Sequence, residues 1–168
     1  MKKSNIILIG MPGSGKSTVG VTLAKLLAKR FLDTDILIQN REKKTLQEII
    51  DDRGHLALRQ IEEEVLLSVS CKGHVIATGG SAAYSDPAMV HLKKDGITVY
   101  LQASLEALRS RITNYETRGV ARRPGQSFQE LFEEREKLYN HYADIAVESS
   151  NLTQDEVSDI IASRLSVM

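Results

Sequence analysis

A glycine-rich motif near the start of the chain constrains the fold more than any other feature. Residues 10–17 read Gly-Met-Pro-Gly-Ser-Gly-Lys-Ser, which matches the pattern GxxxxGK[ST] in full. An aliphatic run, 5–10, precedes the motif, and a segment with helical spacing of apolar residues, 16–29, follows it. Glycines let successive backbone N–H groups point inward, and the helix start adds its positive dipole end. The motif therefore predicts a buried strand, a phosphate-binding loop (the P-loop) and a helix.

Each part of the motif has an expected ligand. Lys16 is expected to reach the β- and γ-phosphates of ATP, and the Ser17 hydroxyl to bind Mg²⁺. The remaining expected nucleotide contacts are the residues around them, Gly13, Ser14, Gly15 and Thr18. A chance match in a chain of this length is expected in about 1% of cases or fewer. The sequence thus predicts ATP and Mg²⁺ as ligands but leaves open how the nucleotide is used.

The rest of the chain alternates between short apolar runs and helical patterns. The further strands are expected at 31–32, 74–78, 97–101 and 145–147. The further helices are expected at 45–69 with a break near Gly54, at 87–94, 105–112 and 127–142, and from 154 onward. This alternation predicts an α/β protein of the P-loop NTPase fold, with a parallel sheet of about five strands flanked by helices. We expect one domain over residues 1–168, and a mobile lid over the polar, arginine-rich segment 113–126.

Composition excludes several classes of partner. Lys plus Arg and Asp plus Glu both number 22, so no overall positive charge attracts nucleic acid or an anionic membrane. No apolar run approaches the roughly 18 residues of a membrane helix, and the apolar run after the basic start is too short for a signal peptide. The one cysteine, Cys71, cannot form an intrachain disulfide and is expected to fill space rather than to react. We therefore expect a cytoplasmic enzyme, and from its size a monomer.

The class of P-loop protein can be narrowed. No NKxD-type motif for reading guanine is present, and motor or transport ATPases normally need a much longer chain. A small kinase remains, which requires a pocket for the phosphoryl acceptor and a lid that excludes water.

Three groups of residues are candidates for the acceptor side. Asp33 and Asp35 stand where the second strand should end, and two carboxylates at i and i+2 of a strand point the same way, although both could be simple turn or cap residues. Arg59 precedes Glu62 by three helical positions, which is also the spacing of a surface ion pair. The pair at 79–80 is glycine, which lets a ligand approach the backbone. The acidic runs 62–64 and 133–134 are expected to be solvated helix faces.

In order and spacing, these motifs resemble the shikimate kinase family over nearly the whole chain. That family has the P-loop, a DTD, a G-E-x-x-F-R-x-x-E segment, a GGG turn, an R-P-L-L lid and an R-x-P-L-Y…A-D helix. The resemblance implies that Asp33 helps to hold Mg²⁺ and that Asp35 positions or deprotonates the acceptor hydroxyl. It implies that Arg123 neutralises the transferring phosphoryl group and that Arg111 stacks on adenine. The implied binding groups for the acceptor carboxylate are two arginines and two glycines, namely Arg59, Arg135, Gly79 and Gly80.

The sequence departs from the family pattern at the acceptor side and in the lid. Ser81 replaces the third glycine, the lid reads Arg-Pro-Gly-Gln, and Arg118 and Arg122 are alternatives to Arg123. The other departures are His55, Leu58, Lys137 and a longer stretch before the lid arginine. Two alternatives to a shikimate kinase follow: a related kinase for another hydroxy acid, a sugar acid or a nucleoside monophosphate, and a non-catalytic nucleotide-binding regulator.

Overall fold

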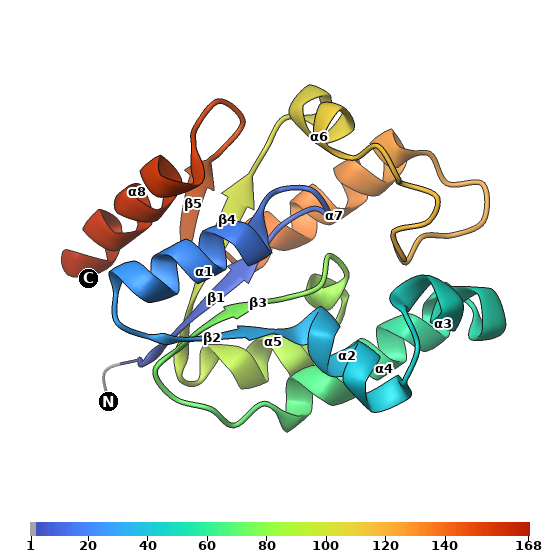
Figure 1. Ribbon diagram of the computed structural model, residues 1–168, viewed down its shortest axis with the longest axis horizontal. Coiled ribbons are helices and arrows are strands. Elements are labelled where there is room, and N and C mark those ends of the chain that lie inside the picture. Colours follow the sequence, from blue (N-terminus) through green and yellow to red (C-terminus); the bar gives the residue numbers. More distant parts are fainter. Residues whose placement is uncertain (1–2) are drawn as a thin grey trace.

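The protein is built around one parallel sheet of five strands, in a computed structural model that describes residues 3–168. The first two residues of the predicted domain, which belong to the basic start, lie outside the described residues. The strands are β1 (Asn5–Ile9), β2 (Arg30–Asp33), β3 (His74–Ala77), β4 (Gly96–Gln102) and β5 (Ile145–Glu148). Their order in the sheet is β2-β3-β1-β4-β5, with every neighbouring pair parallel (Figure 1). The predicted α/β class and strand number are confirmed.

Helices connect the strands and cover the sheet (Figure 1). They are α1 (Lys16–Leu26), α2 (Thr34–Glu42), α3 (Leu46–Arg53), α4 (His55–Ser68), the 3₁₀ turn η1 (Ala82–Tyr84), α5 (Asp86–Lys93), α6 (Leu105–Arg111), α7 (Phe128–Tyr142) and α8 (Gln154–Ser166). The predicted break at Gly54 is confirmed, since this residue has φ 84° and separates α3 from α4. No helix of the described chain is both long and apolar enough to cross a membrane.

Strand β1 is apolar from Ile6 to Ile9 because both of its faces are covered. Ile7 belongs to an apolar cluster that includes Tyr139 of α7, whereas the next residue, Leu8, belongs to a cluster that includes Leu23 of α1. Successive side chains of a strand point to opposite faces, so an uninterrupted aliphatic run is what a strand between two helical layers requires. Burial of β1 fixes the position of the glycine-rich loop that follows it.

Helix α2 was not predicted, and the prediction that Asp33 and Asp35 lie together on a strand was wrong. Asp33 ends β2 and is the N-cap of α2, where its carboxylate accepts a hydrogen bond from the backbone N–H of Asp35. Asp35 lies in the first turn of the helix. The two side chains therefore point to different partners. A capping aspartate before an acidic first turn was the signal that could have identified this helix.

The segment between α6 and α7 contains no helix or strand, as its lack of periodicity predicted. It lies against α3, where the backbone N–H of Gly119 donates to Gln47 Oε1 at 3.0 Å (Figure 1). Gly119 has φ +74°, and a Cβ here would collide with Leu46, so the contact depends on glycine. The segment thus closes over the carboxyl edge of the sheet. Its mobility stays a prediction.

Candidate active site

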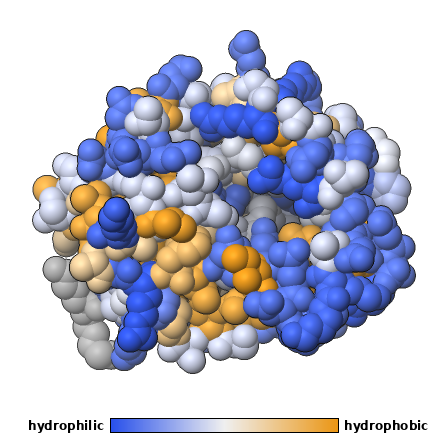
Figure 2. Space-filling model, viewed as in Figure 1, coloured by the Kyte–Doolittle hydropathy of each residue, from blue (hydrophilic) through white to orange (hydrophobic). Residues whose placement is uncertain are grey.

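The loops after β1, β2 and β3 meet at the carboxyl edge of the sheet and form one pocket. β1 lies between β3 and β4, and the chain forms β2 and β3 on one side of it before it crosses to β4 and β5 on the other. Open α/β sheets bind ligands at such a point, where the strand order reverses. Figure 2 shows a hollow near the middle of this face with hydrophilic residues on its rim. The pocket is lined by Pro12, Gly13, Gly15, Lys16, Ser17, Thr18, Asp35, Ile38, Leu46, Leu58, Glu62, Thr78, Gly79, Gly80, Ser81, Arg118, Gly119, Val120, Ala121 and Arg135.

The P-loop takes the conformation that its glycines allow. Gly13 has φ +83° and Gly15 has φ +92°, and Gly15 is the N-cap of α1. A Cβ on Gly13 would lie 2.6 Å from Cγ1 of Ile112, at the end of α6. A side chain would therefore be strained by the backbone at both positions, and at Gly13 it would also collide with Ile112. The result is a loop of bare backbone at a helix N-terminus, which suits a phosphate group.

Lys16 projects from this loop into the pocket, where its side chain is only 8% exposed. Its ammonium donates to the carbonyl oxygens of Gly10 at 2.8 Å and Met11 at 2.9 Å. Burial lowers the pKa of Lys16 to about 8, against the opposing attraction of the Asp35 carboxylate. The charge is thus held in a poorly solvated site by groups that a phosphate could replace.

Ser17 and Asp33 form a pair of oxygen ligands beside the P-loop. The Ser17 hydroxyl donates to Asp33 Oδ2 at 2.6 Å. A hydroxyl and a carboxylate are hard oxygen donors of the type that Mg²⁺ prefers, and they lie next to the expected phosphates. The residues present therefore fit the predicted metal, although their roles stay a prediction.

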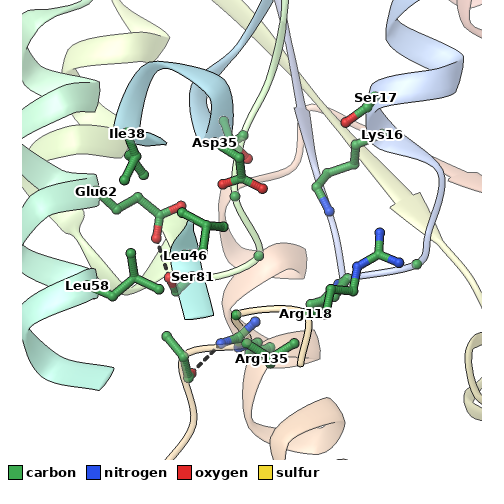
Figure 3. Close-up of a pocket in the computed structure, with 18 of the residues that line it drawn as sticks. Lys16, Ser17, Asp35, Ile38, Leu46, Leu58, Glu62, Ser81, Arg118 and Arg135 are labelled. Atoms are coloured by element: carbon green, nitrogen blue, oxygen red, sulfur yellow. Dashed lines mark hydrogen bonds between the residues drawn. The ribbon is translucent and has the colours of Figure 1, made fainter. Parts of the chain in front are cut away.

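Asp35 and Glu62 are two carboxylates on the side of the pocket opposite the P-loop. Figure 3 shows Asp35 between Lys16 on one side and Glu62 on the other. Burial, together with the Asp33 carboxylate, raises the pKa of Asp35 to about 6. Burial, together with the Asp35 carboxylate, raises the pKa of Glu62 to about 7. Neighbouring carboxylates that share little water disfavour each other's ionisation, which is a frequent property of functional sites.

The prediction that Glu62 is a solvated helix residue was wrong. Its side chain is 3% exposed, and its Oε2 accepts a hydrogen bond from the Ser81 hydroxyl (Figure 3). Oε1 is buried and has no hydrogen-bond partner within the described part of the chain. Ser81, the residue that replaces a family glycine, therefore orients a buried carboxylate of the pocket. Helical spacing alone could not separate Glu62 from its exposed neighbours, because α4 packs against several elements at once.

Gly79 and Gly80 lie where side chains would collide with charged groups. A Cβ on Gly79 would meet the Glu62 carboxylate, and one on Gly80 would lie 2.7 Å from Nη1 of Arg135. The backbone N–H of Gly79 donates to the Thr34 hydroxyl at 3.2 Å. The glycines let α4 and α7 bring their charged side chains to the end of β3.

Arg135 is almost completely buried at 1% exposure. Its Nη2 donates to the carbonyl oxygen of Ala121 in the segment above the pocket at 2.6 Å, and its Nε has no partner among the described residues. A buried cation with a free donor is the type of group that binds an anion.

The structure brings Arg118, and not Arg123, into the pocket. Arg118 lines it beside Lys16 (Figure 3). Arg123 is 63% exposed at its side chain and forms an ion pair with Glu134, with Nη2 and Oε2 separated by 2.9 Å. In this structure Arg123 therefore lies away from the pocket, and its predicted place beside the phosphoryl group stays a prediction. In a segment without periodicity, the choice among its arginines depends on where Gly119 contacts α3.

Arg59 lies outside the first pocket, in an adjoining cavity that shares Glu62 and Ser81 with it. Its guanidinium carbon is 3.6 Å from the centroid of the Tyr84 ring, and its Nε and Nη2 are buried without a partner in the described chain. Arg59 thus stacks on a ring instead of pairing with Glu62.

Arg111 lies on the opposite side of the P-loop. It lines a separate cavity with Gly13, Ser14 and Gly15, and its Nη2 donates to the carbonyl oxygens of Ser149 at 2.9 Å and Ser150 at 2.8 Å. The Ser14 hydroxyl is buried without a partner among the described residues. This position suits the predicted contact with adenine, which stays a prediction.

Comparisons with known proteins agree with this geometry. The family model described as "Shikimate kinase" matches residues 12–166. A shikimate kinase of Sulfurihydrogenibium sp. is 33% identical over 162 residues, covering 96% of this chain and 97% of the relative. One of Aquifex aeolicus is 36% identical over 159 residues, covering 94% of each chain. The solved structure of Acinetobacter baumannii shikimate kinase in complex with shikimate has a TM-score of 0.90 and 32% identity, covering 98% of this chain and 93% of that one. The chain belongs to the shikimate kinase family.

Proposed function

We propose that this protein transfers the γ-phosphoryl group of ATP to a hydroxyl group of shikimate, giving ADP and shikimate 3-phosphate. The observation that carries the proposal is that the P-loop lysine, Lys16, and the carboxylate of Asp35 line one pocket together with Arg135. A pocket of this kind can hold a phosphoryl donor and a hydroxylated acid end to end. The similar structure from Acinetobacter baumannii, which contains shikimate, supports the choice of acceptor.

The proposed reaction uses positioning and charge. The acceptor oxygen bonds to the γ-phosphorus, the bond from that phosphorus to the β–γ bridging oxygen breaks, and the hydroxyl proton passes to Asp35. With its pKa raised to about 6, Asp35 is mostly ionised at pH 7 and is a stronger base than an ordinary aspartate. Mg²⁺, held by Ser17 and Asp33, would neutralise phosphate charge. Lys16 stabilises the negative charge on the transferring group.

Arg59 is expected to bind the acceptor carboxylate with Arg135. Replacing Arg59 with alanine should raise the KM for shikimate at least about tenfold, because a charge-assisted hydrogen bond is lost. The KM for ATP should stay within about twofold. Steady-state kinetics with each substrate varied in turn measures both values, and Arg53→Ala, at an exposed ion pair on α3, is the matched control. Equal increases in both KM values would place Arg59 outside the acceptor site.

The proposed charge-neutralising group of the lid is Arg118. Arg118→Ala is expected to lower kcat about 100-fold or more, since an arginine that stabilises a transferring phosphoryl group contributes a large factor. Arg123→Ala should lower kcat less than about tenfold, because its side chain lies on Glu134. Measuring kcat for the two variants at saturating ATP and shikimate separates these roles. The reverse order of effects would assign the charge-neutralising role to Arg123.

An assay of ADP release with ATP and Mg²⁺ tests the proposed function directly. Shikimate is compared with a panel of hydroxy acids, sugar acids and nucleoside monophosphates. Rapid release that depends on shikimate is the expected result. Turnover on another acceptor alone would mean that Ser81 and the altered lid accompany a different substrate. ATP binding without turnover on any acceptor would favour the regulatory alternative.

A cytoplasmic location, a monomeric state and the absence of a nucleic-acid partner stay predictions.

A further inference from the structure

Tyr84 lies between the two arginines of the acceptor side. It is the last residue of η1, the turn that follows the glycine pair after β3. The guanidinium carbon of Arg59 is 3.6 Å from the centroid of the Tyr84 ring, and that of Arg135 is 5.5 Å from it. A cation this close to a ring is attracted by the negative charge of the ring face. The ring therefore orders both cations.

The ring is the main constraint on Arg59. The Nε and Nη2 atoms of Arg59 are buried and have no hydrogen-bond partner in the part of the chain that the structure describes. Stacking fixes the plane of a guanidinium but leaves its N–H groups free at the edge. Arg59 is thus oriented by Tyr84 while its donors stay available for an anion.

The hydroxyl of Tyr84 connects this arrangement to the segment above the pocket. It donates to Oε1 of Glu134, on the first half of α7. The other oxygen of this carboxylate, Oε2, accepts hydrogen bonds from Nη2 of Arg123 at 2.9 Å and from Nε2 of Gln126 at 3.1 Å. The Tyr84 hydrogen bond also lowers the pKa of the Glu134 carboxyl, which keeps it an acceptor.

Gln126 fixes the end of the lid segment with a buried side chain. Its side chain is 5% exposed, and its Oε1 accepts a hydrogen bond from the backbone N–H of Arg123 at 3.2 Å. Residues 123–126 are therefore held by one carboxylate, and that carboxylate is held by Tyr84. One continuous set of contacts joins the segment to Arg59.

We propose that Tyr84 is a positioning residue for the acceptor and that Glu134 couples it to the lid segment. Tyr84 sets the orientation of Arg59, and Glu134 makes that orientation depend on residues 123–126. This proposal deepens the proposed function and rests on it for the identity of the acceptor. Coupling of this kind acts in both directions, so disturbing either end changes the other.

Four single variants of the full chain, and the double variant Tyr84→Phe with Glu134→Gln, test the coupling. Tyr84→Leu removes both the ring and the hydroxyl, Tyr84→Phe removes only the hydroxyl, and Glu134→Gln removes the charge that the segment contacts. Tyr142→Phe is the matched control. Tyr142 lies on α7 with Glu134, and its hydroxyl also donates to a carboxylate, that of Asp86, at 2.8 Å in an exposed position. Calorimetry measures the Kd for shikimate and for ATP, and limited trypsin digestion measures cleavage after Arg118 and Arg122.

The expected results differ between the variants. Tyr84→Leu raises the Kd for shikimate about tenfold and leaves the Kd for ATP within about twofold. Tyr84→Phe and Glu134→Gln each raise the Kd for shikimate about threefold, and the double variant raises it no further, because both break the same connection. Both also accelerate cleavage of the lid segment, because the Tyr84 hydroxyl acts on it through Glu134. Tyr142→Phe changes none of these values.

The outcomes separate this inference from the proposed function. If the unaltered protein binds shikimate and Tyr84→Leu binds it equally well, the positioning role is wrong. Equal losses for shikimate and ATP would make Tyr84 a structural residue only. If the unaltered protein binds no shikimate, the proposed acceptor is wrong, and the digestion still decides the coupling. Unchanged cleavage in Tyr84→Phe would then overturn it.

Discussion

Replacing Lys16 with methionine is expected to lower kcat about 1000-fold or more while leaving the fold intact. Methionine keeps most of the length and apolar character of the buried side chain, so packing around the P-loop should change little. What is lost is the one positive charge that projects from the glycine-rich loop into the pocket, and charge stabilisation of the transferring group is usually the largest contribution to such reactions. ADP release measures the loss, and circular dichroism checks the fold.

The environment of Lys16 adds a dependence on pH. Because burial lowers its pKa to about 8, the free enzyme loses this proton as the pH rises through that value. The kcat/KM for ATP should therefore fall above about pH 8. Lys25→Met, in the last turn of the same helix, is the control and should keep normal activity. Normal turnover by Lys16→Met would overturn the assignment of this pocket to phosphoryl transfer.

Replacing Asp35 with asparagine is expected to abolish measurable turnover and, at the same time, to stabilise the protein at pH 8. The amide cannot accept the acceptor's proton, so kcat should fall about 1000-fold or more. The stability gain follows from the raised pKa of Asp35, which is about 6 in the folded protein and 3.8 for an ordinary aspartate. Keeping this partly buried carboxylate ionised costs at most about 3 kcal/mol, less what solvent screening removes.

The sign of the effect can be tested against pH. Above about pH 6 the carboxylate is ionised in both the folded and the unfolded chain, and the folded chain bears the full cost. As the pH falls from about 6 towards 3.8, the Asp35 carboxylate binds a proton in the folded protein but stays ionised in the unfolded chain. The cost of ionisation in the folded protein therefore disappears over this range. Denaturant melts of Asp35→Asn should thus show a stability gain at pH 8 that shrinks at pH 5. Asp159→Asn on α8 is the control, and a gain that grows at low pH would refute the assignment.

Much of this site could be predicted because the responsible signals are local. The P-loop is eight consecutive residues. The strand before it is a short apolar run, and in a chain where strands and helices alternate such a run indicates a buried strand. The starts of α7 and α8 are specified in the same way, by Ser or Thr followed three residues later by Glu. Once these elements are placed, the order of the strands brings their loops together.

The errors lie where tertiary contacts decide. The burial of Glu62 depends on Ser81, which is 19 residues away, and no helical period records that contact. Arg118 lines the pocket because Gly119 contacts α3, more than 70 residues earlier in the chain. Helix α2 carries three consecutive apolar residues, 36–38, which match neither a helical nor a strand period. In each case the deciding partner is distant in sequence, so local patterns are silent.

The central place of β1 puts most of the proposed acceptor groups on one side of the sheet and the predicted adenine contact on the other. The proposed acceptor groups Asp35, Arg59, Gly79 and Gly80 come from connections around β2 and β3, and Arg135 joins them from α7. Arg111 and its partners follow β4 and β5. Changes confined to residues 34–84 can alter the choice of acceptor while ATP remains the phosphoryl donor and its binding affinity stays the same. Gene duplication followed by drift in that half would be enough to found a new metabolic branch. For inhibitor design, the same arrangement means that selectivity is to be sought on the β2–β3 side rather than at the P-loop.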